Sequence, residues 1–364
     1  RGADVMVTSC PDMKQVEPLT ASQIAHFRRD GYLVLPAVLD PELCRQARDE
    51  MWGAIETDLP RMKRGEPSTW APITEEESSR LSAQKPAGGG EPYLGGSGHR
   101  LTIRNGAEEL LLNLAPRALW QVAEQLLGKG TLVWPAGLDE SGTTTGPCFM
   151  SDDAVGGLAS HMGSEMGWPS GGSFTTEEAL RLPKTGPVWL NGQGTRGLYC
   201  TLPKSPSPGP EYRGSHSDGA CYGRWRLQMA AYTDDVPPNS GAFTVWPGSH
   251  TRIWKEQWKA FQAGEKHTDT HLAVRNAGGY NDPVIAEIKV DTQPFDCYGP
   301  SGTVVLWHTK ILHIAGQNVS SNVIRQATIY GFLKTLVALP DPLVVDNTNG
   351  DIWRDWSDEV RATS

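Results

Sequence analysis

A histidine and a carboxylate lie one residue apart in residues 214–220, which read GSHSDGA. In extended chain, residues i and i+2 point to the same face, so His216 and Asp218 would present an imidazole and a carboxylate side by side. Such a pair suits a divalent metal ion, and a third ligand from elsewhere would complete the two-histidine, one-carboxylate set that holds non-haem iron(II). Gly and Ser also form ordinary surface turns. H-x-D alone is therefore a weak signal that depends on partners elsewhere in the chain.

Candidate partners lie downstream, in the stretch GTVVLWHTKILHIAGQNVSSNVIRQATIYGF (302–332). His313 follows a strand-like run, and Arg325 opens the next one 12 residues later. This spacing permits a hairpin-like return that would aim both side chains into one barrel. Arg325 suits a carboxylate ligand because its planar guanidinium pairs bidentately and stays charged. Taken alone, His313 would more often be a core histidine and Arg325 a surface ion-pair partner.

The first part of the chain predicts helices that would flank such a site. Thr20 and Gln23 form a capping-box pattern for a helix over 19–31, and Gly31 is placed to end it. A strand-like run follows at 32–39.

A second helix is expected to open at Asp40-Pro41-Glu42, which combine a capping side chain, a proline and an acid in the first turn. Its apolar residues recur every four positions and predict one buried face; they are Leu43, Ala47, Met51 and Ile55. A third helix is expected over 116–127, stopped by Gly128.

The second half of the chain has the pattern of β-structure. Short runs rich in β-branched and aromatic residues are broken by Gly, Pro and Asn, which indicates a sandwich or barrel. These runs are 226–233, 241–248, 302–308 and 325–333. Between the two halves, residues 135–187 have little periodicity and much Gly, Ser and Thr, as in a lid or binding loop or in a disordered insertion.

Composition excludes several classes of partner. The formal net charge is −9, and the short basic cluster RMKR (61–64) is expected to be a solvated helix end or loop, so nucleic acid is not predicted as a partner. Apolar runs such as 32–39 are far shorter than the ~20 residues of a membrane helix, so no membrane partner is expected. These features favour a cytoplasmic protein whose partner is a small-molecule substrate; its oligomeric state is left open.

The six cysteines are scattered without a C-x-x-C pair, which predicts free, buried thiols rather than a zinc site or a disulfide framework. Asn318-Val319-Ser320 matches the pattern of a glycosylation acceptor, but without a secretory signal this tripeptide is weak evidence for glycosylation.

Several of these stretches together resemble the phytanoyl-CoA dioxygenase family of iron(II)- and 2-oxoglutarate-dependent oxygenases. The resemblance lies in H-x-D and the distal His313 with its Arg325, and in three further segments. These segments are LTASQIAHFRRDGYLVLPAVLDPE (19–42), APRALWQVAEQLLG (115–128) and NSGAFTVWPGSH (239–250). Each of these matches is weak evidence by itself, whereas their combined order along the chain is specific for the family.

The resemblance implies a fold and a set of roles. The fold is a double-stranded β-helix, a jelly-roll or cupin-like barrel that is mostly β with flanking helices. His216, Asp218 and His313 would bind Fe(II), and Arg325 would bind the distal carboxylate of 2-oxoglutarate. O2 is the second co-substrate, and succinate and CO2 are released.

Two further positions bear on this implied chemistry. Related halogenases carry a small residue where this chain has Asp218, so the aspartate favours hydroxylation or desaturation of an unactivated C–H bond. Many family members also place a hydroxyl residue where this chain has Ala315. Additional carboxylate partners are expected from the strand before H-x-D, with Tyr199 and Thr201 as candidates.

The whole chain, 1–364, is interpreted as one dioxygenase domain. N-terminal helices and first strands occupy 1–134, the lid-like insertion 135–187, the barrel core with its metal site 188–336, and a C-terminal tail 337–364. Alternative functions are a cupin-like metal-binding protein without oxygenase activity, a non-catalytic binding protein and an acyl-CoA hydroxylase.

The remaining histidines carry weaker expectations. His308 would support the site from a second layer or simply pack, and His250 would fix a turn. His267 and His271 could mimic a metal pair but are expected in a solvated loop, and His161 is assigned no role.

Overall fold

A computed structural model describes most of the chain outside the 135–187 segment. The described residues are 16–84, 94–103, 118–129, 131–132, 195–205, 214–217, 225–262, 283–320, 322–333 and 350–363.

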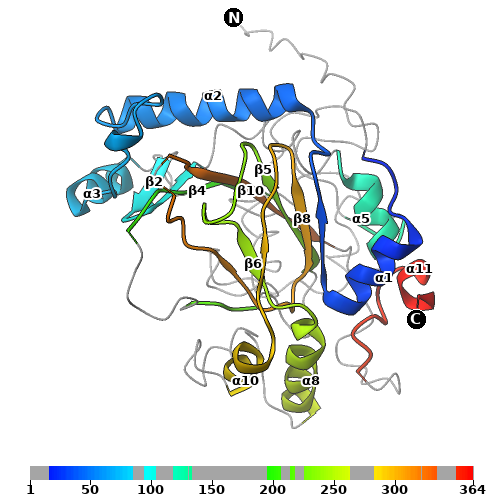
Figure 1. Cartoon of the computed structure of the whole chain (residues 1–364). Coiled ribbons are helices and arrows are strands. Elements are labelled where there is room, and N and C mark those ends of the chain that lie inside the picture. Colours follow the sequence, from blue (N-terminus) through cyan, green and yellow to red (C-terminus); the bar gives the residue numbers. More distant parts are fainter. Residues whose placement is uncertain are drawn as a thin grey trace, which may run out of the picture.

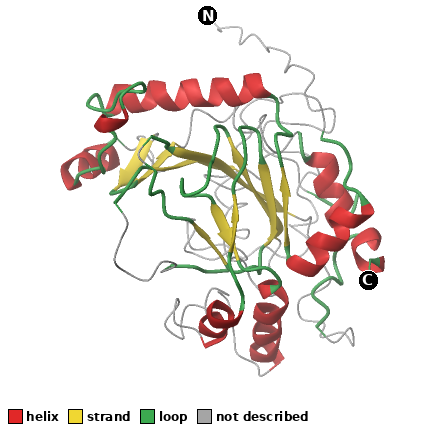
Figure 2. Cartoon of the chain, viewed as in Figure 1, coloured by secondary structure: helices red, strands yellow, loops and turns green. Residues whose placement is uncertain are grey.

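Two antiparallel sheets form the centre of the molecule, with helices around them (Figures 1 and 2). The larger sheet has seven strands in the order β1 (Tyr32–Leu35), β8 (Val304–His308), β5 (Trp225–Tyr232), β10 (Arg325–Leu333), β4 (Thr195–Thr201), β3 (Arg100–Ile103) and β2 (Leu94–Ser97). The smaller sheet has three strands in the order β7 (Phe295–Cys297), β6 (Phe243–Val245) and β9 (His313–Ala315). This arrangement confirms the predicted mostly-β class with flanking helices, and the described strands form two sheets rather than a closed barrel.

Strand β8 shows how the sequence builds this layering. All five of its residues are buried, as expected for a strand covered on both faces. Because side chains alternate, Val304 and Leu306 pack in the cluster that includes the helices, whereas Val305 and Trp307 pack with the smaller sheet. The two sheets therefore share one apolar interior, to which Phe243 of β6 contributes.

Helices cover the outside of the sheets (Figure 1). Helices α1 (Ala21–Asp30), α5 (Trp120–Leu127) and α11 (Asp358–Ala362) gather on one side, and α2 (Pro41–Asp58) runs along one end. Helix α3 (Glu75–Ala83) lies beside β2, and α8 (Ser249–Gln262) and α10 (Pro283–Asp291) lie at the end opposite α2. A short 3₁₀ helix, Pro67–Thr69, follows α2.

The predicted helix starts are confirmed in atomic detail. Thr20 and Gln23 form a capping box at α1, and Gly31 ends it in the left-handed region with φ of 80°. The Asp40 side chain accepts hydrogen bonds from the first turn of α2. Of the predicted apolar face, Ala47, Met51 and Ile55 are fully buried.

Some elements were not predicted from the sequence. Helices α3, α8, α10 and α11 had no counterpart among the expectations, and Trp353 and Trp356, from the segment interpreted as a tail, belong to the main core. The third helix is observed over Trp120–Leu127, later than expected, because residues 118–119 form a turn before it.

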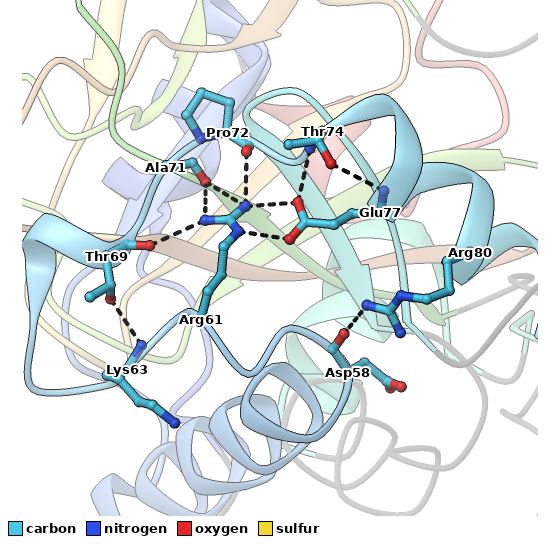
Figure 3. Close-up of polar contacts among 9 residues, drawn as sticks. All are labelled: Asp58, Arg61, Lys63, Thr69, Ala71, Pro72, Thr74, Glu77 and Arg80. Atoms are coloured by element: carbon cyan, nitrogen blue, oxygen red, sulfur yellow. Dashed lines mark hydrogen bonds and ion pairs between the residues drawn. The ribbon is translucent and has the colours of Figure 1, made fainter.

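The basic cluster 61–64 is only partly solvated, contrary to expectation. Met62 is fully buried, and Arg61 organises the loop between α2 and α3 through several hydrogen bonds (Figure 3). Of the cysteines, Cys44, Cys200 and Cys297 are free and buried, as predicted. Among the described residues, the helices are all too short or too polar to cross a membrane.

Candidate active site

The structure brings His216 and His313 side by side, although they are far apart in the chain. Their backbones form an antiparallel bridge in which His216 N donates to His313 O at 2.9 Å and His313 N donates to His216 O at 2.8 Å. The ring centroids are 4.5 Å apart. Directly paired residues point to the same face of a sheet, so both imidazoles face the same space.

Both imidazoles are held in the same way. Nδ1 of His216 lies 3.0 Å from Gly214 O, and Nδ1 of His313 lies 3.0 Å from Ile311 O. A carbonyl oxygen only accepts, so Nδ1 carries the proton of the neutral ring and Nε2 carries the lone pair. This is the form in which histidine binds a metal, with the second nitrogen fixed by a backbone carbonyl.

Several contacts fix the position of His313 on the smaller sheet. Strand β9 pairs with β6 through Val245 opposite His313. The backbone of the preceding residue, Leu312, donates to Ser249 Oγ at 2.8 Å and accepts from Trp246 N at 3.0 Å. The Phe243 ring stacks on His313 at 5.1 Å between centroids. The start of α8 and strand β6 thus hold the imidazole from two sides.

The predicted third ligand, Asp218, lies outside the described residues. Within the described ranges, His, Cys, Asp and Glu nowhere form a group of three that could hold a metal ion. Imidazole ligands suit iron(II), zinc or copper equally by softness, so the metal-ligand set remains a prediction from the sequence.

Arg325 opens β10 and is almost fully buried, with 5% of its surface exposed. Its guanidinium donates to Thr201 Oγ1 at 2.7 Å and to Tyr199 O at 3.4 Å, whereas its Nε has no hydrogen-bond partner among the described residues. Burial lowers the pKa of Arg325, and the nearby positive charge of Arg100 acts in the same direction. An unpaired buried charge is costly, so this guanidinium fits an anionic ligand.

The chain between His313 and Arg325 is not the hairpin that the spacing suggested. Strand β9 belongs to the smaller sheet and β10 to the larger one, so the chain crosses between the sheets. Asn318 anchors this crossing, because its buried amide donates to Thr201 O at 2.8 Å and to Val323 O at 2.7 Å. The same amide would be the acceptor of a glycan, and its burial excludes that role here.

One cavity of about 270 Å³ joins these groups. His216 and His313 line one part of it, and Arg325, Tyr199 and Thr201 line another. Apolar side chains make up much of the remaining wall; they include Leu101, Phe243, Trp307, Ile314 and Ile329. Ala315 also lines it, at the position where many family members carry a hydroxyl.

Sequence reasoning missed two residues of this region. Asn318 was considered only for modification, although its position between the His313 strand and Arg325 could have indicated an anchor. Arg100 also lines the cavity. It lies far from every motif in the sequence, and no local signal pointed to it.

Two other histidines pack away from the cavity. His308 is buried and stacks on Trp356 at 5.0 Å between centroids, which favours a packing role. His250 was expected in a turn but lies in the first turn of α8, with Nε2 3.2 Å from Arg28 O. His161, His267 and His271 lie outside the described residues.

Similarity to known proteins was found at two levels. The family model described as phytanoyl-CoA dioxygenase matches residues 176–327, a stretch that contains all the predicted site residues. No curated protein matches the chain.

The solved structures found are only distantly similar to this chain. AviO1 from Streptomyces viridochromogenes is 16% identical over 90% of this chain and 98% of its own, with a TM-score of 0.42. SnoK, a non-haem α-ketoglutarate-dependent carbocyclase of nogalamycin biosynthesis, is 14% identical over 87% of each chain, with a TM-score of 0.42. EctD from S. alaskensis, solved with bound Fe, is 13% identical over 88% of this chain and 83% of its own, with a TM-score of 0.41.

The identities and TM-scores of these structures are too low to support an argument about function. The functional assignment therefore rests on the family match and on the motifs within it. Residues 176–327 match the phytanoyl-CoA dioxygenase family model, and with the motifs they contain they support an iron(II)- and 2-oxoglutarate-dependent dioxygenase.

Proposed function

We propose that this dioxygenase hydroxylates or desaturates an unactivated C–H bond of a small organic molecule, with release of succinate and CO2. One observation carries the proposal. Two histidines with fixed Nδ1 atoms and a buried arginine without a carboxylate partner among the described residues line a single cavity.

In this proposal His216 and His313 hold iron(II) through Nε2, and Asp218 supplies the carboxylate. The backbone carbonyls of Gly214 and Ile311 keep each ring in the metal-binding form. Bound iron with 2-oxoglutarate and O2 would supply the oxidising chemistry, whereas the protein binds the substrate and orients the C–H bond that is oxidised.

Arg325 and Thr201 form the binding site for the far carboxylate of 2-oxoglutarate. Thr201 Oγ1 accepts from the guanidinium at 2.7 Å, which leaves its own O–H available to donate to the ligand. Thr201 thus provides a hydroxyl in a site where Ala315 provides none. Tyr199 contributes its backbone carbonyl, which orients Arg325.

The apolar part of the wall determines what can be oxidised. Phe243 and Trp307 pack against each other at 4.3 Å between centroids and both lie close to the His313 ring. Such a surface excludes water and holds a hydrocarbon portion of the substrate near the metal ligands. The size of the cavity and the net charge of −9 favour a small molecule over nucleic acid.

The test is iron- and 2-oxoglutarate-dependent formation of succinate by the purified chain. We expect His216→Ala to abolish it, whereas His26→Ala, which removes a histidine of α1 remote from the cavity, should retain it. A metabolite screen would then use the same readout, with mass spectrometry to detect the gain of one oxygen or the loss of two hydrogens. Succinate formation that persists in the presence of an iron chelator would contradict the proposal.

The same experiment separates the alternatives. A cupin-like metal-binding protein would bind the ion without forming succinate, and a non-catalytic binding protein would show no affinity for iron by calorimetry. An acyl-CoA hydroxylase would form succinate only when supplied with CoA thioesters.

A further inference from the structure

A second guanidinium lines the cavity beside Arg325. Arg100 opens β3 and lies opposite Thr201 of β4, which in turn lies opposite Arg325 of β10. Directly paired residues share one face of the sheet, so both arginines project from the face that lines the cavity and flank Thr201. Neighbouring strands are about 4.8 Å apart, which separates the two arginine backbones by roughly 10 Å.

The two arginines differ in burial. Arg325 is buried between β5 and β4, whereas Arg100 lies nearer the sheet edge and is exposed. Arg100 therefore lies toward the solvent side of the cavity, where a ligand enters. Arg325 lies at its closed side.

Arg100 has no carboxylate within ion-pair distance in the part of the chain that the structure describes. Two positive charges facing one cavity repel each other, and the pKa of Arg325 is lowered first by burial and also by Arg100. An anionic ligand would relieve this repulsion.

The co-substrate does not account for both arginines. In the proposed function, one carboxylate of 2-oxoglutarate binds Arg325 and the other lies at the metal. Arg100 then still has no carboxylate partner among the residues that the structure describes. Arg100 adds a single positive charge to the cavity. A carboxylate, with one negative charge, matches it better than a phosphate dianion does.

We propose that Arg100 binds a carboxylate of the substrate that is oxidised, and so selects carboxylic acids at the mouth of the cavity. This inference rests on the proposed function, because it takes the Arg325 subsite as occupied by 2-oxoglutarate. The substrate would place its carboxylate near β3 and its apolar part toward Phe243 and Trp307.

The test uses matched probes, namely small carboxylic acids and their methyl esters, with succinate formation as the readout. We expect turnover of acids rather than of their esters. For an acid that is turned over, Arg100→Gln should raise its KM on the order of 10-fold or more, because a charge-assisted bond is lost. The KM for 2-oxoglutarate should not rise with it.

Two variants serve as controls. Arg64→Gln removes the same charge from an exposed arginine that pairs with Asp49 outside the cavity, and it should leave both KM values unchanged. Arg100→Lys keeps the charge without the bidentate geometry and should recover part of the affinity for the acid.

Three outcomes would overturn the inference. Equal turnover of esters and acids would show that no carboxylate is selected. A rise in the KM for 2-oxoglutarate in Arg100→Gln would assign Arg100 to the co-substrate and leave the proposed function intact. If the wild-type chain forms no iron-dependent succinate, either with the probes or without them, the proposed function and this inference are rejected together.

Discussion

Arg61 and Arg325 both donate hydrogen bonds to neighbouring groups, yet they serve different purposes. Arg61 lies in the loop after α2, where its Nε and Nη2 donate to the two carboxylate oxygens of Glu77 at 2.7 and 2.9 Å (Figure 3). Its remaining donors reach the carbonyl oxygens of Thr69, Ala71 and Pro72 at 2.9 to 3.2 Å. Within the described part of the chain, Arg325 donates to one hydroxyl and to one more distant carbonyl, and its Nε has no partner there.

The difference shows how a structural arginine can be told from a binding one. The Arg61 side chain is 33% exposed and its charge is matched by Glu77. The Arg325 residue is 5% exposed and has no carboxylate partner among the described residues. A protein that buries a charge without matching it retains the electrostatic cost, and a ligand that brings the opposite charge recovers it.

The largest effect is expected from Arg325→Gln. Removing the guanidinium should lower kcat/KM for 2-oxoglutarate by about 30-fold or more, because truncating one partner of a buried charge pair costs about 2–5 kcal/mol. Urea unfolding should show no loss of stability, since the substitution removes an unmatched buried charge. Retention of co-substrate affinity, or a marked loss of stability, would place Arg325 in the same class as Arg61.

The next effect is expected from Arg61→Gln, and on stability alone. The substitution removes a bidentate ion pair and leaves three carbonyls without this donor. We expect the free energy of unfolding to fall by about 2 kcal/mol in urea titrations, a figure reduced for the partial exposure of the pair. The KM for 2-oxoglutarate should stay at the wild-type value. A change in KM without a change in stability would break the distinction between the two arginines.

The smallest effect is a pH dependence carried by Glu77. Hydrogen bonding to Arg61 lowers the pKa of this carboxyl from 4.5 to about 2, against the opposing effect of burial. A lowered folded-state pKa means that the stabilisation is complete above pH 4.5 and is lost as the pH falls toward 2. The difference in unfolding free energy between wild type and Glu77→Gln should be about 1 kcal/mol at pH 7 and should shrink between pH 4.5 and 2. Urea titrations at several pH values measure it, and a difference that stays constant with pH would rule out the ion pair as its source.

Local sequence patterns predicted the elements well where neighbours in the chain determine them. The capping box at Thr20 and Gln23, the Asp40 cap and the strands β5, β8 and β10 all lie where they were expected. Helix α3 also opens with a capping box, Thr74 with Glu77, and could have been found in the same way.

The site was only partly predictable. The motifs identified His216, His313 and Arg325 as residues of interest, but the spacing suggested a hairpin where the chain instead crosses between sheets. Arg100 could not be placed from the sequence, because its role comes from pairing with β4 across a long stretch of chain.

The sequence by itself determined the starts of α1 and α2, the alternation of the buried strands and the residue types able to bind iron and a carboxylate, because these depend on neighbours within a few positions. Only the tertiary structure decided that two histidines meet across a backbone bridge and that two arginines flank one threonine. The physical reason is strand register. A shift of one residue would turn every side chain to the other face, and packing between distant elements fixes that register.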